Sequence, residues 1–285
     1  MVKVNEYEEL THFLYGGAAE YKRLQSVWRL VEADEAFSKS TRAYMNHSQR
    51  YVDSLRKVKR FQEICDELMP DDESWSLEKA YEIYLALDEN TPLDVHLSMF
   101  IPVLQHHTSS EQRQRWLPKA QRFRIIGAYA QTELGHGSNV RSLETTATFD
   151  VNTDEWVVHS PSLSSTKFWP GGLGHTCTHA IVYARLIIRG HDLGVHPFMV
   201  PLRCPSTHRP LPGVRCGDIG PKLGYNAMDN GYARFDHVRI PRTNMLQGFA
   251  HVDRHGTYSK SPGAEKLQGG IMLSVPARIV KNSAH

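Results

Sequence analysis

The spacing of apolar residues changes once along this chain, near residue 125, and that change limits the folds it can adopt. Before this point, apolar residues recur every three or four positions, as they do on one face of a helix. After it, short runs alternate between apolar and polar residues or are rich in β-branched side chains, as strands are. A helical part followed by strands predicts an α+β fold rather than alternating βαβ units.

The helical pattern is clearest in residues 51–68 and 77–85. Ser76 directly precedes the second of these runs and is the expected N-cap, because its hydroxyl can accept a hydrogen bond from a free amide at the helix start. Thr108 and Glu111 have the spacing of a capping box, so a further helix is expected to begin there. Pro118 is expected to end that helix.

Five runs of strand-like residues follow, and most of them pair naturally as hairpins. Residues 150–154 form the expected turn of the first hairpin, and residues 189–194 form the expected loop of the second. Residues 203–231 are rich in Gly and Pro and predict a long ordered loop. The predicted strands are residues 144–149, 155–159, 180–188, 195–202 and 232–240.

Bulk composition excludes several classes of function. The formal charge of +2 is close to neutral, so we expect no nucleic-acid partner, and the basic run at residues 56–60 is better explained as a solvated helix face. No apolar stretch approaches the ~20 residues that a membrane span needs. The four cysteines are scattered, which favours a reducing compartment over a disulfide framework.

Two clusters of glycines mark candidate binding loops, one at Gly135 and Gly137 and one at residues 171–174. Glycine allows the backbone to approach a ligand closely and to adopt positive φ angles, but ordinary turns use it for the same reasons. No Gly-x-Gly-x-x-Gly motif follows a strand, and no P-loop motif is present. Neither a Rossmann site nor a P-loop nucleotide site is therefore predicted.

The longer motifs around these glycines resemble those of a known family. The run YAQTELGHGSN at residues 129–139 resembles the first flavin-contacting loop of acyl-CoA oxidases, and KFWPGGLG at residues 167–174 is similar to their second. Further matching runs lie at residues 92–100, 217–225 and 239–246. Over residues 40–275 the chain resembles the amino-terminal and middle domains of a peroxisomal acyl-CoA oxidase, within the acyl-CoA dehydrogenase/oxidase superfamily.

This resemblance implies a division into three parts. Residues 1–125 are expected to form an amino-terminal α-helical domain. Residues 126–265 are expected to form an antiparallel β-sandwich or barrel-like domain that binds flavin and acyl-CoA. Residues 266–285 are expected to be only the start of a carboxy-terminal helical domain, with the remainder of that bundle missing from the chain. The family also implies a homodimer.

The same resemblance assigns FAD as the cofactor and places residues around it. Thr132 is expected to hydrogen-bond the polar edge of the isoalloxazine ring, and Gly171 to let the second loop pass close to it. For Trp169, a core aromatic beside a Pro-Gly turn remains the alternative. The further candidates for lining this pocket are Gln131, Gly137, Ser138 and Trp169.

The reaction implied by the resemblance is the conversion of a fatty acyl-CoA and O2 to trans-2-enoyl-CoA and H2O2 in peroxisomal fatty acid β-oxidation. The flavin performs the redox chemistry, while the protein positions and tunes it. In the family the base is a glutamate in the carboxy-terminal helical region. That region lies beyond these 285 residues, so no catalytic residue is assigned, and Glu133 is not mapped onto the base.

Two alternatives to an oxidase stay open, and no metal site is predicted. The chain could be a catalytically incompetent family member that binds acyl-CoA or flavin or pairs with another subunit, or it could be an acyl-CoA dehydrogenase. His175, Cys177 and His179 would face one way on a strand, but their spacing is not that of the usual zinc sites. With 16 histidines in the chain, chance explains this cluster better.

Overall fold

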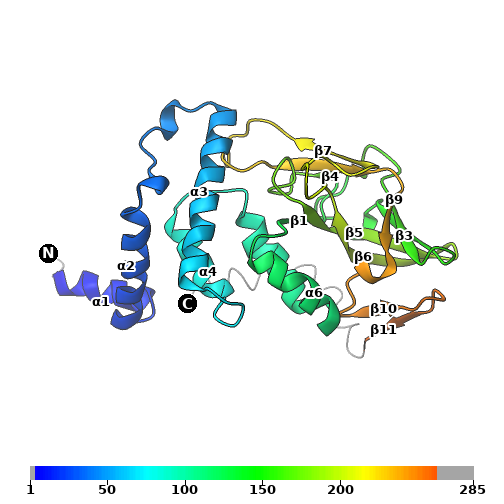
Figure 1. Cartoon of the computed structure of the whole chain (residues 1–285), viewed down its shortest axis with the longest axis horizontal. Helices are drawn as coiled ribbons and strands as arrows, with labels where there is room; N and C mark the ends of the chain where they lie inside the picture. The colour runs from blue at the N-terminus through cyan, green and yellow to red at the C-terminus, as the bar shows by residue number, and fades with distance from the viewer. Residues whose placement is uncertain (1–3, 262–285) are drawn as a thin grey trace.

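The computed structural model describes residues 4–261, which form a helical region and a β region lying side by side (Figure 1). The switch from helices to strands falls between residues 121 and 127, where the hydrophobic period changes. The predicted α+β class is therefore confirmed. The helices are α1 (Val4–Leu14), α2 (Ala18–Glu32), α3 (His47–Leu68), α4 (Leu77–Ala86), α5 (Ile101–His106) and α6 (Ser110–Gln121), with a π-helical turn at His96–Phe100.

Side-chain caps set where these helices begin. Ser76 caps α4 by accepting a hydrogen bond from the Lys79 amide at 3.3 Å, as predicted. The capping box of α6 lies one residue later than predicted, because Ser109 and Gln112 make the reciprocal bonds. Thr108 instead donates its hydroxyl hydrogen to the Leu104 carbonyl of the preceding helix, 2.5 Å away.

The prediction that Pro118 ends α6 is wrong, because the helix continues to Gln121. Proline removes one intrahelical hydrogen bond, which normally favours termination. Here Trp116 and Ala120 on either side of it are buried, and their packing against the core holds the last turn.

A six-stranded sheet dominates the β region, with the order β1-β5-β2-β3-β9 and β6 along the other side of β5. β1 pairs with the first half of β5 and β2 with its second half, both in parallel, so the sheet is mixed rather than wholly antiparallel. Its strands are β1 (Gly127–Ala130), β2 (Thr146–Asp150), β3 (Glu155–His159), β5 (His179–Ile188), β6 (His191–Pro201) and β9 (Val238–Pro241).

A second sheet contains β4 (Lys167–Phe168), β8 (Gly231–Phe235) and β7 (Val214–Asp218) in the order β4-β8-β7. β7 lies within residues 203–231, which were predicted as a loop. The predicted strand 232–240 is in fact two strands in different sheets. The break falls at Asp236 and His237, where His237 adopts a φ of 51°.

Turn geometry explains why β6 begins earlier than the predicted strand at residues 195–202. β6 begins at His191, because Arg189 and Gly190 alone make the turn after β5, with φ angles of 51° and 79°. Two residues of positive φ are typical of a tight type I′ hairpin turn. A smaller hairpin, β10 (Ala250–Val252) with β11 (Tyr258–Lys260), ends the described chain.

Two apolar cores stabilise the molecule. One joins the helices to one face of the larger sheet, and the other fills the space between the two sheets. In the second core, Trp156 of β3 meets Phe198 of β6 edge-on at 5.3 Å. No helix within residues 4–261 is both long and apolar enough to cross a bilayer.

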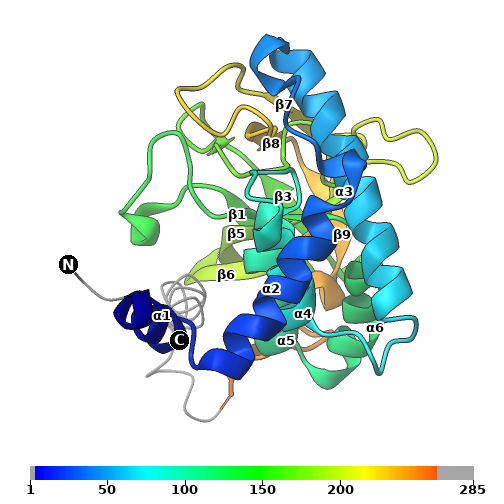
Figure 2. The same cartoon turned by 90° about the vertical axis from the view of Figure 1, so that its left-hand side faces the viewer.

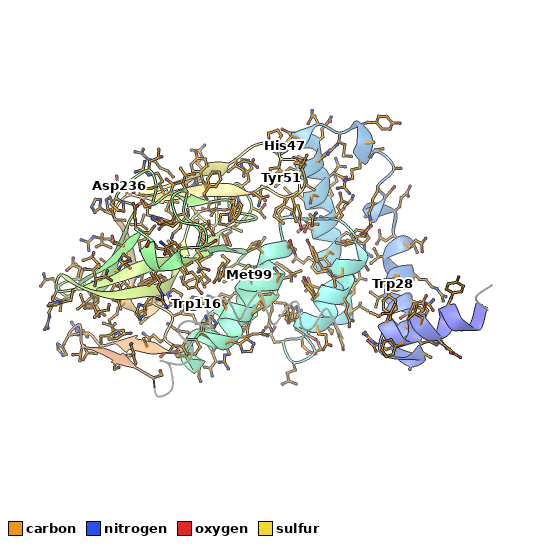
Figure 3. The ribbon with its side chains drawn as sticks, turned by 180° about the vertical axis from the view of Figure 1, so that it is seen from behind. Trp28, His47, Tyr51, Met99, Trp116 and Asp236 are labelled. Carbon is orange, nitrogen blue, oxygen red and sulfur yellow. The ribbon has the colours of Figure 1, made fainter. Side chains whose placement is uncertain are left out.

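Polar contacts fix the helical region to the β region. The buried His96 ring bonds the Ala120 carbonyl and accepts a hydrogen bond from the Gly127 amide, each at 3.0 Å. Burial lowers the pKa of His96 to about 4, which keeps this ring neutral. A second contact comes from the first turns of α3. The Tyr51 hydroxyl lies 3.0 Å from that of Thr176, so α3 also contacts the loops of the β region (Figures 2 and 3).

Candidate functional site

The first glycine loop, residues 131–139, leaves the end of β1 and reaches into solvent at its tip. Gln131 and Thr132 at its base are half-buried, whereas Gly137 and Ser138 are exposed. A Cβ atom built on Gly137 would meet nothing within 4 Å, so packing does not require glycine there. At Gly135 the same atom would lie 2.7 Å from the Ser164 Cβ, so the close backbone approach in this loop occurs at Gly135.

The buried side chain of Glu133 anchors the base of the first loop. Its carboxylate is fully buried and accepts hydrogen bonds from the Glu144 amide at 2.8 Å and the Thr145 amide at 2.9 Å. The Thr145 hydroxyl donates at 2.6 Å, the His136 Nδ1 lies at 3.0 Å, and the Lys167 ammonium donates at 2.9 Å. The loop is thus tied to the strand that follows it and to the second loop.

The electrostatics of this pair follow from burial and proximity. Burial acts to raise the pKa of Glu133, but the charge of Lys167 and the donated hydrogen bonds outweigh it and lower the pKa. Burial lowers the pKa of Lys167 to about 8, against the opposing effect of Glu133. A carboxylate with a lowered pKa and so many donors is a poor general base, so Glu133 has a positioning role and not a proton-abstracting one.

The backbone joins the two loops directly. The Phe168 amide donates to the Thr132 carbonyl at 3.1 Å, and the Leu134 amide donates to the Thr166 carbonyl at 2.8 Å. The Lys167 ammonium adds a bond to the Gln131 carbonyl at 3.2 Å. Residues 131–134 and 166–168 therefore lie side by side, although they are far apart in sequence.

Trp169 follows this junction and points into solvent. Its side chain is 59% exposed, and its backbone adopts a φ of 68°, which is unusual for a residue with a bulky side chain. The Asn230 side chain holds the Trp169 carbonyl at 2.7 Å. The alternative that Trp169 is a core aromatic is wrong. The strained backbone of this exposed aromatic, one residue after the Phe168–Thr132 hydrogen bond, makes Trp169 a candidate ligand contact.

Gly171 belongs to the second loop and is buried. A Cβ atom at this position would come within 2.3 Å of the Met228 sulfur and 2.9 Å of the Val95 side chain. The glycine is therefore required by internal packing against the helical region, which sequence alone did not indicate.

The rest of the second loop is held by two buried charged side chains. Arg203 donates to the carbonyls of Cys177 and Gly174 at 2.7 Å each and to that of Leu173 at 3.2 Å. Asp229 accepts from the backbone amides of residues 175 and 176 at 2.6 and 2.8 Å. Burial raises the pKa of Asp229, in contrast to Glu133.

His175, Cys177 and His179 would face one way only if they lay on one strand. They do not lie on one strand, because β5 begins only at His179. Cys177 is buried and burial raises its pKa, whereas His175 is exposed. Within residues 4–261, the one group of side chains close enough to share a metal ion lies elsewhere, at His159, Asp236 and His237.

The structure thus brings together Gln131, Thr132 and Trp169, leaves Gly137 and Ser138 at an exposed tip, and buries Gly171 below. Sequence reasoning missed the supporting residues Glu133, Lys167, Arg203 and Asp229. Their charge in otherwise apolar or glycine-rich runs is the signal that could have identified them, but the pairing of Glu133 with Lys167, 34 residues away, is visible only in the fold.

The fold and the paired loops define a member of the acyl-CoA dehydrogenase and oxidase class. Residues 128–238 match the model for the acyl-CoA dehydrogenase middle domain, and residues 6–126 match that for the acyl-coenzyme A oxidase N-terminal region. The chain belongs to the acyl-CoA oxidase family.

Individual relatives agree with this assignment. Peroxisomal acyl-coenzyme A oxidase 1 of Arabidopsis thaliana is 42% identical over 98% of this chain and 42% of its own length, and the Rattus norvegicus protein of the same name is 43% identical over 97% and 42%. An acyl-CoA oxidase structure from tomato is similar with a TM-score of 0.88 at 44% identity, over 96% of this chain and 42% of that one.

A structure of acyl-CoA oxidase-2 from Caenorhabditis elegans, bound with FAD, ascaroside-CoA and ATP, has a TM-score of 0.82 at 39% identity. The match covers 90% of this chain and 39% of that one. The present chain therefore spans about two fifths of the length of the relatives it matches.

Proposed function

We propose that this chain forms the flavin- and acyl-CoA-binding portion of an FAD-dependent acyl-CoA oxidase. The observation that carries the proposal is the junction of the two loops, where the half-buried Thr132 and the exposed Trp169 are brought together by the hydrogen bond between the Thr132 carbonyl and the Phe168 amide. Membership in the acyl-CoA oxidase family, and a relative whose structure holds FAD, support FAD as the cofactor.

The residues at this junction have chemistry that suits a flavin. Thr132 offers a hydroxyl and an amide to the polar edge of an isoalloxazine ring, and Gln131 offers a second polar side chain beside it. Trp169 offers an exposed aromatic face on which a planar ring can stack. Gly137 leaves open space at the tip, next to Ser138, where a larger side chain would restrict approach. Gly171 contributes indirectly, by keeping the second loop close to the helical region.

When bound, FAD would supply the hydride acceptor for α,β-dehydrogenation of a fatty acyl-CoA, with O2 as the final acceptor. The chain's own task is to hold the loops in place and to orient the ring through Thr132. Glu133 is occupied by its own hydrogen-bond donors, so the base that removes the α proton is expected from outside these residues. By the same family argument we propose a peroxisomal location and a homodimer.

A titration of FAD into the purified chain tests the cofactor assignment. We expect saturable binding, seen as quenched flavin fluorescence, and a loss of about tenfold in affinity for Trp169→Ala, because base–aromatic stacking is worth about 1–3 kcal/mol. Tyr44→Ala is the control, since it removes an exposed aromatic from the helical region, outside the two loops. Equal affinity of the chain and both variants would contradict the proposed role of Trp169.

Acyl-CoA and oxygen then distinguish three outcomes. Peroxide formed in proportion to acyl-CoA consumed identifies an oxidase. Flavin that is bleached by acyl-CoA and stays bleached in air identifies a dehydrogenase. Flavin binding without bleaching means that these residues hold the cofactor but do not turn over by themselves, as expected where the base comes from outside them.

A further inference from the structure

A group of metal-ligand side chains lies at the end of one strand and in a nearby turn of the β region, outside the two flavin loops. His159 is the last residue of β3, and Asp236 and His237 form the turn between β8 and β9. Asp236 is labelled in Figure 3, on the side of the β region away from α3. These residues play no part in the proposed flavin site.

The backbone around these side chains is fixed on both sides. Residue 160 donates its amide hydrogen to the Phe235 carbonyl at 2.8 Å, and the Ser160 hydroxyl accepts from the Phe235 amide at 3.2 Å. The Asp236 amide donates to the Gly213 carbonyl at 2.8 Å. With its neighbours tied in this way, His159 is held beside the turn that carries Asp236 and His237.

The potential ligand atoms already lie close together. The Asp236 Oδ1 is 2.8 Å from the His237 Nδ1 and 3.9 Å from the His159 Nδ1, and each residue offers an atom within 4.8 Å of the others. The two imidazole rings stack with centroids 4.0 Å apart and an angle of 26°. Zinc–ligand distances of about 2.0–2.2 Å place neighbouring ligand atoms about 3.3 Å apart. Because an imidazole nitrogen binds a metal in the plane of its ring, at least one of the two stacked rings must turn out of the stack to share the ion.

A second observation points to a ligand at the same place. The His159 Nδ1 is shielded from solvent and has no hydrogen-bond partner among the described residues. A shielded ring nitrogen without a partner is costly, and a metal ion bound between His159 and Asp236 would satisfy it. The neighbouring surface is a depression of about 630 Å³ lined by Thr146, Val157 and Arg239 among others, which leaves room for water to complete the coordination.

We propose that His159, Asp236 and His237 bind one divalent transition-metal ion of the zinc class. Two imidazoles and one carboxylate are ligands that Zn²⁺ prefers, with an open fourth position for water. The ion would link β3 of the larger sheet to the turn at the end of β8 of the smaller one. Arg215 is the cation that acts on Asp236 from the neighbouring strand β7, and its charge opposes metal binding without occupying the ligand atoms.

Zinc titration by calorimetry, on chelator-treated protein without an affinity tag, tests this site. We expect one zinc ion per chain at pH 7.5, and at least a tenfold loss of affinity for His237→Asn and for His159→Thr. Asn tolerates the left-handed backbone of residue 237, and Thr suits the strand at 159, so both variants should fold. His255→Gln is the matched control, because His255 lines the same depression outside the ligand group.

Two further readouts distinguish a metal site from a purely structural cluster. Zinc should raise the melting temperature of the wild-type chain and of His255→Gln, but not that of His237→Asn. Cu²⁺ as a probe should show nitrogen hyperfine coupling from both imidazoles in its electron paramagnetic resonance spectrum, and from fewer in either variant. No saturable zinc binding by the wild-type chain, or wild-type affinity in His237→Asn, would overturn the proposal.

Discussion

The two glycine loops lie side by side, but buried carboxylates of opposite character hold them. In the first loop Glu133 is paired with Lys167, and hydrogen bonds and that charge lower its pKa below the usual range. In the second loop Asp229 is held by backbone amides and the Thr176 hydroxyl, and burial raises its pKa. The carboxylate of the first loop is thus held by an ion pair, whereas that of the second loop is held by neutral donors.

Glycine also has different roles in the two loops, because the surroundings of the two loops are packed differently. The tip of the first loop is open, so Gly137 has space around it, whereas Gly171 in the second loop is enclosed by Met228 and Val95. Within this chain, the glycine-rich motifs therefore include both an open position at a loop tip and a position where internal packing leaves no room for a side chain.

The largest effect is expected for Glu133→Gln, which keeps the shape of the side chain but leaves the Lys167 ammonium buried without its carboxylate. Breaking one partner of a buried ion pair typically costs about 3–5 kcal/mol, and we expect a loss of this size in the free energy of unfolding by urea denaturation. Adding Lys167→Met should recover part of the loss, because the two positions are coupled. Additive effects in the double variant would contradict the pairing.

Gly171→Ala should have the next largest effect, because its Cβ would lie 2.3 Å from the Met228 sulfur. Overpacking of this kind costs about 1–3 kcal/mol, measured as a lower midpoint of urea unfolding. Gly137→Ala is the matched control and should change stability by less than about 0.5 kcal/mol, since its added atom meets nothing. A similar cost at both positions would remove the distinction between the two glycines.

Much of this arrangement was predictable from the sequence, and the limits have physical causes. The period of the apolar residues predicted the helices and the change to strands, and Ser76 predicted a helix start, because these are local properties. The extension of α6 past Pro118 depended on tertiary packing of Trp116 and Ala120, which no local pattern contains. The split of residues 232–240 into two strands depended on the left-handed conformation of His237, which a histidine can adopt but does not signal as a glycine would.

The candidate site was likewise predictable from the sequence only in part. Motifs identified both loops and named Thr132 and Trp169, but the exposure of Trp169 and the burial of Gly171 follow from how the loops meet. The pairing of Glu133 with Lys167 joins segments that the sequence separates by the whole first hairpin, so only the fold reveals it. Residues 266–285, where the start of a further helical domain was expected, lie outside the described residues.

Asp229→Asn should lower the free energy of unfolding by less than Glu133→Gln does. The size of this difference measures how differently the two loops depend on their carboxylates. The amide keeps one acceptor oxygen but loses the other, so one of the donors at residues 175 and 176 is left without a partner. A loss of about 1 kcal/mol in unfolding free energy is expected, since Asp229 makes no direct ion pair within residues 4–261. A loss as large as that of Glu133→Gln would show that Asp229 also balances a buried positive charge.

Acidification should change the costs of these two variants in opposite directions, which is the smallest of the expected effects. The folded pKa of Glu133 is lowered, so its stabilisation is present above the unfolded value of 4.5 and is lost as pH falls through the folded value. The folded pKa of Asp229 is raised above 3.8, so the wild-type protein gains stability as pH falls through that value. The cost of Glu133→Gln should therefore shrink on acidification, and that of Asp229→Asn should grow.

Each tenfold difference in proton affinity corresponds to about 1.4 kcal/mol, so urea unfolding of the wild-type chain and both variants across pH 7 to 3.5 can resolve the trend. Parallel changes in the two variants would mean that both loops rest on the same kind of carboxylate, and the distinction drawn between them would fail.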